Sequence, residues 1–165
     1  MMLRYGFRGL RHAPIDDFFA QYPEFNYDEK VPLWVEFRLL CEHYGWSKES
    51  PRRIEARRRF KEAMISEFGK LYGTNNSSLS SWQKLCRVLE ISPIPEDIKS
   101  CRKDVLSVHV NLVDLVDCHR TGERVRKFPN LRELREYTQL SEKYFPAIEA
   151  KAKGPLKYLL RHILG

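Results

Sequence analysis

The chain has 165 residues, of which 42% are hydrophobic and 12% aromatic, and its formal net charge is +7. This length suits a single domain with a self-sufficient core, and the composition excludes intrinsic disorder as the state of the whole chain. No apolar run approaches the roughly 18 residues that a membrane-spanning helix needs, so we expect no membrane insertion.

The N-terminal segment is basic, with no acidic residue and three arginines, Arg4, Arg8 and Arg11. We interpret residues 1–13 as a basic arm that precedes one α-helical domain at 14–165. Mitochondrial targeting is the alternative, because transit peptides are also rich in arginine and poor in acids, although this segment lacks their serines. Four scattered cysteines without a Cys-x-x-Cys spacing indicate free thiols, so our main expectation is a nuclear or cytoplasmic location.

Along the rest of the chain, apolar residues recur mostly at spacings of three and four, which predicts helices rather than strands. Proline or a capping side chain precedes most of these runs, and both favour the first turn of a helix. The expected helices begin at or near Pro14, Pro32, Pro51, Leu79, Pro95, Val105, Asn130 and Pro146. The sequence therefore predicts an all-α fold, a compact bundle of six to eight helices with short loops.

The third expected helix has the clearest limits. Ser50 offers a hydroxyl as N-cap, Pro51 takes the first helical position, and Gly73 follows the last residue, Tyr72. The stretch Val105–Val116 has a mixed pattern, because its first half alternates as a strand does while its second half does not. Its polar residues share one helical face, so we predict a central, mostly buried helix there.

The charge is polarised along the sequence. Lys48–Lys61 holds seven basic residues and two acids, whereas residues 12–47 hold seven acids and two bases. The apolar row of the third helix, continued towards its start, meets Arg53 and Arg57. Because burying unpaired charge is costly, we predict that the first two turns project beyond the bundle or meet the acidic segment.

This basic helix start is the leading candidate site, because arginine forms paired hydrogen bonds to phosphate and carboxylate groups. The predicted residues are Arg52, Arg53, Arg57, Arg58, Arg59 and Lys61, joined by Arg4, Arg8 and Arg11 of the arm. The alternative is a solvated face whose charges are balanced by Glu55 and Glu62. A helix–turn–helix at 79–107 is disfavoured, because its connector is long and holds two prolines.

Aromatic residues gather in the N-terminal part of the chain. The candidates for a contact with a protein partner are Phe18, Phe19, Tyr22, Phe25 and Tyr27. They would serve as an exposed aromatic anchor, a kind of residue that interfaces favour. The alternative is a strap that clamps the bundle, because an exposed apolar patch of this size is a solubility liability.

Recognisable catalytic and cofactor-binding motifs are missing from the sequence. Cys41 with His43, and Cys118 with His119, would supply four zinc ligands if they packed together, but their spacings match no zinc finger. We therefore predict neither a metal nor a cofactor. His109 lies among valines and leucines, where a neutral histidine bonded to a carbonyl or carboxylate is the expected state.

Three stretches carry a resemblance to a family. They are Leu71-Tyr72-Gly73-Thr74 running on to Trp82-Gln83-Lys84-Leu85-Cys86, His109-Val110-Asn111-Leu112-Val113-Asp114-Leu115-Val116, and Leu156-Lys157-Tyr158-Leu159-Leu160-Arg161-His162-Ile163. Together they resemble a group of small, uncharacterised fungal proteins, over about Ala13 to Ile163. The resemblance implies a fungal source and transfers no activity, cofactor or site residue.

Three hypotheses of function follow from the sequence. The first is a non-enzymatic helical interaction module that binds nucleic-acid phosphate or an acidic protein surface through the basic helix start. The second is a protein–protein adaptor, a subunit of a complex that uses the aromatic N-terminal segment. The third is a small enzyme or ligand carrier with a pocket around His109.

Overall fold

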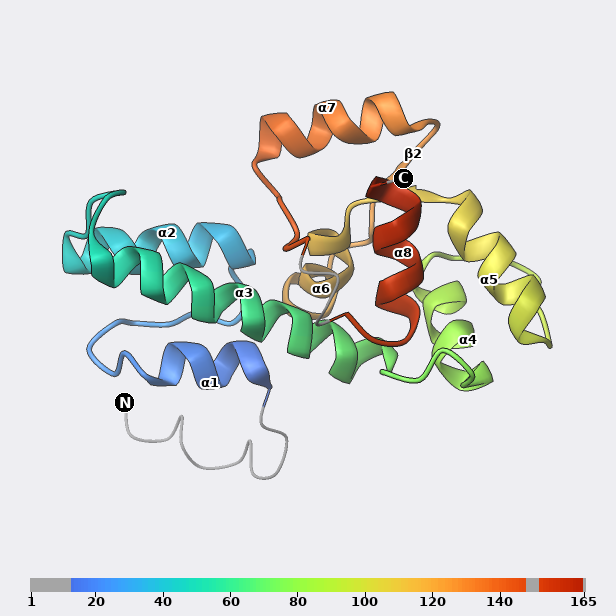
Figure 1. Cartoon of the computed structure of the whole chain (residues 1–165), viewed down its shortest axis with the longest axis horizontal. Coiled ribbons are helices and arrows are strands. Elements are labelled where there is room, and N and C mark those ends of the chain that lie inside the picture. The colour runs from blue at the N-terminus through green and yellow to red at the C-terminus, as the bar shows by residue number, and fades with distance from the viewer. Residues whose placement is uncertain (1–12, 148–151, 165) are drawn as a thin grey trace.

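The computed structural model describes residues 13–147 and 152–164, which form eight helices and one two-stranded sheet (Figure 1). The helices are α1 (Pro14–Ala20), α2 (Leu33–Tyr44), α3 (Pro51–Tyr72), α4 (Leu79–Val88), α5 (Ile98–Ser107), α6 (Leu112–Thr121), α7 (Leu131–Ser141) and α8 (Pro155–Leu164). The strands are β1 (His109–Val110) and β2 (Lys127–Phe128). The predicted all-α bundle is confirmed. In the described part of the chain, no helix is long and apolar enough to cross a bilayer.

Local signals set most of the helix limits. The predicted range of α3 is confirmed, although the Ser50 hydroxyl accepts no hydrogen bond from the first turn, so the side-chain cap expected there is wrong. Later helices do have side-chain caps, because Asp97 accepts from the Ser100 amide and Asn130 from the Glu133 amide. Helix α2 ends at Tyr44, and Gly45 follows it with a φ of 65°, in the left-handed region that glycine adopts without strain.

The continuous helix predicted over Val105–Val116 is wrong. Helix α5 ends at Ser107, and β1 then pairs antiparallel with β2, with Val110 opposite Lys127. A new helix, α6, begins after Asn111, because the Asn111 side chain caps it by accepting hydrogen bonds from the amides of Val113 and Asp114. Of the alternating apolar residues before Asn111, only Val110 lies in the strand, because Leu106 belongs to α5 and Val108 is its C-cap.

The long helix α3 connects two parts of the molecule (Figure 1). Its first half lies with α2, α1 runs along its middle, and its second half contacts α4, α6 and α8. One connected cluster of buried apolar side chains runs through these elements, from Ile15 in α1 to Leu160 in α8. Helix α7 stands farther out, and its backbone approaches the two short strands.

Candidate functional site

Two carboxylates on α3 engage part of its basic surface. Glu55 accepts from the guanidinium of Arg58 at 2.6 Å and from that of Arg59 at 3.1 Å. Arg58 also contacts Glu62 at 3.0 Å, one turn farther along the helix. The hydrogen bonds from Arg58 lower the pKa of Glu55 to about 2, so its carboxylate stays charged across the physiological range. Glu55 and Glu62 therefore compensate the positive charges of Arg58 and Arg59.

The other cations of α3 have different surroundings. The Arg53 Nη1 donates to the carbonyl of Trp46 at 3.2 Å, and the Arg57 guanidinium lies 5.5 Å from the ring centroid of Trp34. Arg52 is exposed, and Lys61 is partly exposed. Within the described residues, none of these four cations forms an ion pair with a carboxylate. The uncompensated charge of this helix therefore lies on them.

Of the two alternatives for the start of α3, projection beyond the bundle is wrong, because this part of the helix packs against residues of the segment 12–47. Ala56 and Phe60 are buried there, with exposed fractions of 1% and 0%. The aromatic rings of α1 and α2 cover this side of the helix, and the arginines lie on the sides that remain. Arg4, Arg8 and Arg11 of the basic arm lie outside the described residues.

The N-terminal aromatic residues pack on the bundle. Phe18 and Phe19 are buried, with exposed fractions of 3% and 1%, and both contact the ring of Phe60. The half-buried Tyr27 stacks on Phe19 with a centroid distance of 4.4 Å. Tyr22 and Phe25 are also partly buried against the core. This is the arrangement of a strap, and it leaves Phe18 and Phe19 without a surface that a partner could contact.

Arg120 of α6 fastens that strap through two hydrogen bonds from its guanidinium. Its guanidinium donates to the Tyr27 hydroxyl at 2.6 Å and to the Val31 carbonyl at 3.0 Å. The Tyr27 hydroxyl in turn donates to Asp16 at 2.6 Å, so the contact reaches α1. Burial raises the pKa of Tyr27, which keeps this hydroxyl a donor.

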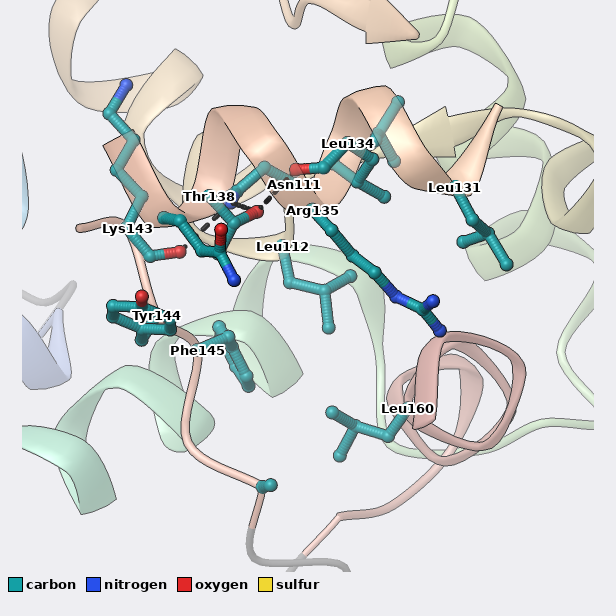
Figure 2. A pocket seen from close by; sticks show the side chains of 13 residues that line it. Asn111, Leu112, Leu131, Leu134, Arg135, Thr138, Lys143, Tyr144, Phe145 and Leu160 are labelled. Atoms are coloured by element: carbon teal, nitrogen blue, oxygen red, sulfur yellow. Dashed lines mark hydrogen bonds between the residues drawn. The ribbon is translucent and has the colours of Figure 1, made fainter. Parts of the chain in front are cut away.

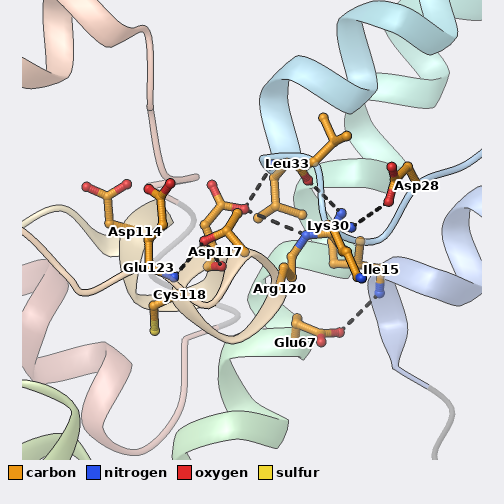
Figure 3. Close-up of polar contacts among 12 residues, drawn as sticks. Ile15, Asp28, Lys30, Leu33, Glu67, Asp114, Asp117, Cys118, Arg120 and Glu123 are labelled. Carbon is orange, nitrogen blue, oxygen red and sulfur yellow. Dashed lines mark hydrogen bonds and ion pairs between the residues drawn. The ribbon is translucent and has the colours of Figure 1, made fainter.

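The buried carboxylate of Asp117 shares this region (Figure 3). Its Oδ1 accepts from the Leu33 amide at 2.9 Å, at the start of α2, and lies 3.7 Å from the Arg120 Nε. Its Oδ2 and that Nε have no hydrogen-bond partner in the described part of the chain. Burial therefore outweighs the nearby positive charges and raises the pKa of Asp117 to about 6.

A second polar group joins α6 to α7 and to the segment after it. Asp114 contacts the Lys143 ammonium at 2.8 Å and accepts from the Tyr137 hydroxyl at 2.7 Å. The Asn111 amide nitrogen donates to the Thr138 hydroxyl at 3.1 Å and to the Lys143 carbonyl at 2.9 Å. The sequence offered one signal for this group, which was the presence of carboxylates inside an apolar run.

The histidines are dispersed. His119 contacts the Tyr72 hydroxyl through Nε2 at 3.0 Å, and because that hydroxyl donates to the Leu115 carbonyl, His119 must be the donor. Burial lowers the pKa of His119, so its ring is neutral near pH 7. His109 stacks on His162, and its buried Nδ1 has no partner among the described residues. No group of three or more ligating side chains suited to a metal ion occurs in the described part of the chain.

A cavity of about 230 Å³ lies beneath α7, between that helix, the start of α6 and α8 (Figure 2). Its walls are mostly apolar, and they include Leu112, Leu131, Leu134, Phe145 and Leu160. Val110 also lines it, but the adjacent His109 does not, so this cavity is not the pocket around His109 of the third hypothesis. Spacing in the sequence could not reveal this cavity, because its walls come from four separate segments.

No protein-family model, no curated protein and no solved structure matches the chain. The resemblance to small fungal proteins stays a prediction, and the function has to be inferred from the geometry of the sites.

Proposed function

We propose that the chain is a non-enzymatic interaction module that binds nucleic-acid phosphates through one side of α3. The binding residues are Arg53, Arg57 and Lys61, with the exposed Arg52 as a further contact. The observation that carries this proposal is the division of the cations by their partners. Glu55 and Glu62 form ion pairs with Arg58 and Arg59, so these two arginines contribute little to the attraction of a phosphate. The other four cations have no carboxylate beside them among the described residues, so their positive charge is not compensated.

Three of the four form a row on the helix. Arg53, Arg57 and Lys61 are separated by four residues each, which places successive side chains on one side at intervals of about 6 Å along the axis. Such a row presents repeated charges to a phosphate backbone, whose attraction to a protein is electrostatic and independent of base sequence. The expected affinity therefore decreases steeply as salt concentration increases.

The aromatic neighbours of the row support a nucleic-acid partner. Trp34 lies under the Arg57 guanidinium, and its Nε1 is fixed by a hydrogen bond to the Tyr144 carbonyl at 2.9 Å. Trp46 lies beside Arg53, stacked on Tyr44 with a centroid distance of 5.1 Å. Cations interleaved with half-buried aromatic rings are typical of surfaces that bind single strands. These contacts also restrict the arginine side chains before any partner arrives.

The test compares two charge-removing variants. In Arg53→Gln/Arg57→Gln the row loses two charges. Log affinity for a fluorescent single-stranded oligonucleotide decreases as log salt concentration increases, and the steepness of this negative slope should be smaller by about 1.4 in the variant. The matched control is Lys99→Gln/Lys103→Gln on α5, which removes two charges at the same spacing from another exposed surface. The control should keep the slope of the natural protein.

Two results would contradict the proposal. One is an unchanged slope in the Arg53/Arg57 variant, and the other is an equal decrease in both variants, which would indicate attraction by net charge alone. If the natural protein binds poly-glutamate but no oligonucleotide, and the same variant abolishes that binding, the partner is an acidic protein surface instead.

A further inference from the structure

We propose that the cavity beneath α7 binds a small amphipathic anion, a carboxylate with an aliphatic or aromatic body. The apolar body would fill the cavity, and the carboxylate would lie at its rim against the guanidinium of Arg135 (Figure 2). This inference does not rest on the basic row on α3, because none of the cations of that row lines the cavity. It rests on the size of the cavity, on the composition of its walls and on the surroundings of Arg135.

The size of the cavity limits the ligand. An apolar cavity of about 150 Å³ in another protein holds benzene, so about 230 Å³ suits roughly nine non-hydrogen atoms. A peptide helix is about 10 Å across and cannot enter a space of this size. The side chains of Leu112, Leu134 and Leu160 form walls that an alkyl chain or a phenyl ring would contact.

The cations near the cavity indicate that its ligand is an anion. Two of them line it, Lys143 and Arg135. The Lys143 ammonium is committed to Asp114 and the Tyr137 hydroxyl, both at 2.8 Å. Arg135 forms no ion pair or hydrogen bond within the described residues, and its side chain extends from α7 across the cavity towards α8 (Figure 2). A guanidinium left over apolar walls is complementary to an anion with an apolar body.

The neighbouring Arg132 shows that this arrangement is specific to one position. Arg132 lies one turn before Arg135 on α7, and its Nε is 4.0 Å from the Glu136 carboxylate. Its side chain is 81% exposed, and it does not line the cavity. The two arginines thus carry the same charge on the same helix but differ in their access to the cavity.

The probes are octanoate and octan-1-ol, which share an alkyl chain and differ in charge. With the full-length protein, octanoate should bind more tightly than octan-1-ol in calorimetric titrations. Octanoate should also shift the NMR amide signals of residues on the cavity walls, such as Asn111, Thr138 and Phe145. In Arg135→Gln the affinity for octanoate should decrease about tenfold, the equivalent of about 1.4 kcal/mol, while that for octan-1-ol stays unchanged.

Arg132→Gln is the matched control and should bind both probes as the natural protein does. Equal affinity for octanoate and octan-1-ol would overturn the choice of an anion. An equal loss of octanoate binding in the two arginine variants would overturn the role of Arg135. The absence of octanoate binding, or NMR shifts confined to residues away from the cavity, would overturn the site itself.

Discussion

The region around the first half of α3 and the region around α7 are held in different ways. Around α3, the centroid of the Phe60 ring lies within 6 Å of the ring centroids of four other aromatic residues, Phe18, Phe19, Trp34 and Phe37. Helix α7 instead depends on polar contacts of Asp114 and Asn111, and a cavity lies beneath it. A densely packed aromatic cluster thus fixes charged side chains on its surface, whereas a helix attached by polar contacts leaves room for a ligand.

The largest expected effect is in the aromatic cluster. Phe60→Ala should lower the free energy of unfolding by about 3–5 kcal/mol, because it leaves a cavity among closely packed rings. Leu134→Ala in α7 should cost about 2 kcal/mol, near the lower limit for this change, since Leu134 already borders empty space. Urea denaturation of both variants measures the difference. Equal losses would show that the two regions are packed alike.

Asp117 should make stability depend on pH. Its folded pKa of about 6 lies above the ordinary value of 3.8, so the folded state binds the proton more tightly. The stabilising contribution is complete below about pH 4 and is lost as the pH increases through about 6, with a change of about 3 kcal/mol at most. The free energy of unfolding, measured by urea denaturation at about pH 4 and about pH 7, should therefore differ less between the two pH values in Asp117→Asn than in the natural protein.

The control for that experiment is Asp97→Asn at the start of α5. A hydrogen bond from the Ser100 amide lowers the pKa of Asp97, so its contribution is lost as the pH decreases, which is the opposite direction. If Asp117→Asn kept the full pH dependence of the natural protein, the buried carboxylate would not be its source.

Two alanine substitutions, each at an asparagine that caps a helix, test how α7 is attached to the rest of the protein. Asn111→Ala removes the cap of α6 together with the bonds to Thr138 and Lys143, and should cost about 2–3 kcal/mol. Asn130→Ala removes only the exposed cap of α7 and should cost about 1 kcal/mol. Amide hydrogen exchange within α7 should accelerate more in the Asn111 variant. Equal acceleration in both would mean that Asn111 does not anchor α7.

The smallest effect concerns the ion pairs of α3. Glu55→Gln removes the carboxylate between Arg58 and Arg59 and frees their charge, with little change in unfolding free energy because all three groups are exposed. The affinity for a single-stranded oligonucleotide at low salt should increase by about twofold. A decrease would indicate that these ion pairs position the binding residues rather than neutralise them.

The helices could be predicted in this detail because their signals are local. Pro51 and Gly73 delimit α3, and Asn130 caps α7, each through contacts within a few residues. The error at Val105–Val116 has a non-local cause. The pairing of Val110 with Lys127 and the bonds from Asn111 to the end of α7 involve residues far apart in the sequence.

The all-α class, the run of cations at the start of α3 and five of the eight helix starts follow from the sequence, because each depends on neighbouring residues. The starts expected at Pro95, Val105 and Pro146 are wrong, since α5 begins at Ile98, α6 at Leu112 and α8 at Pro155. The tertiary structure alone decided which cations stay uncompensated, since that depends on whether a carboxylate or an aromatic ring such as Trp34 comes to lie beside each one. It also decided the position of the cavity, whose walls are brought together by folding. The +7 charge is therefore a property of the sequence, whereas its four uncompensated positions on α3 are a property of the fold.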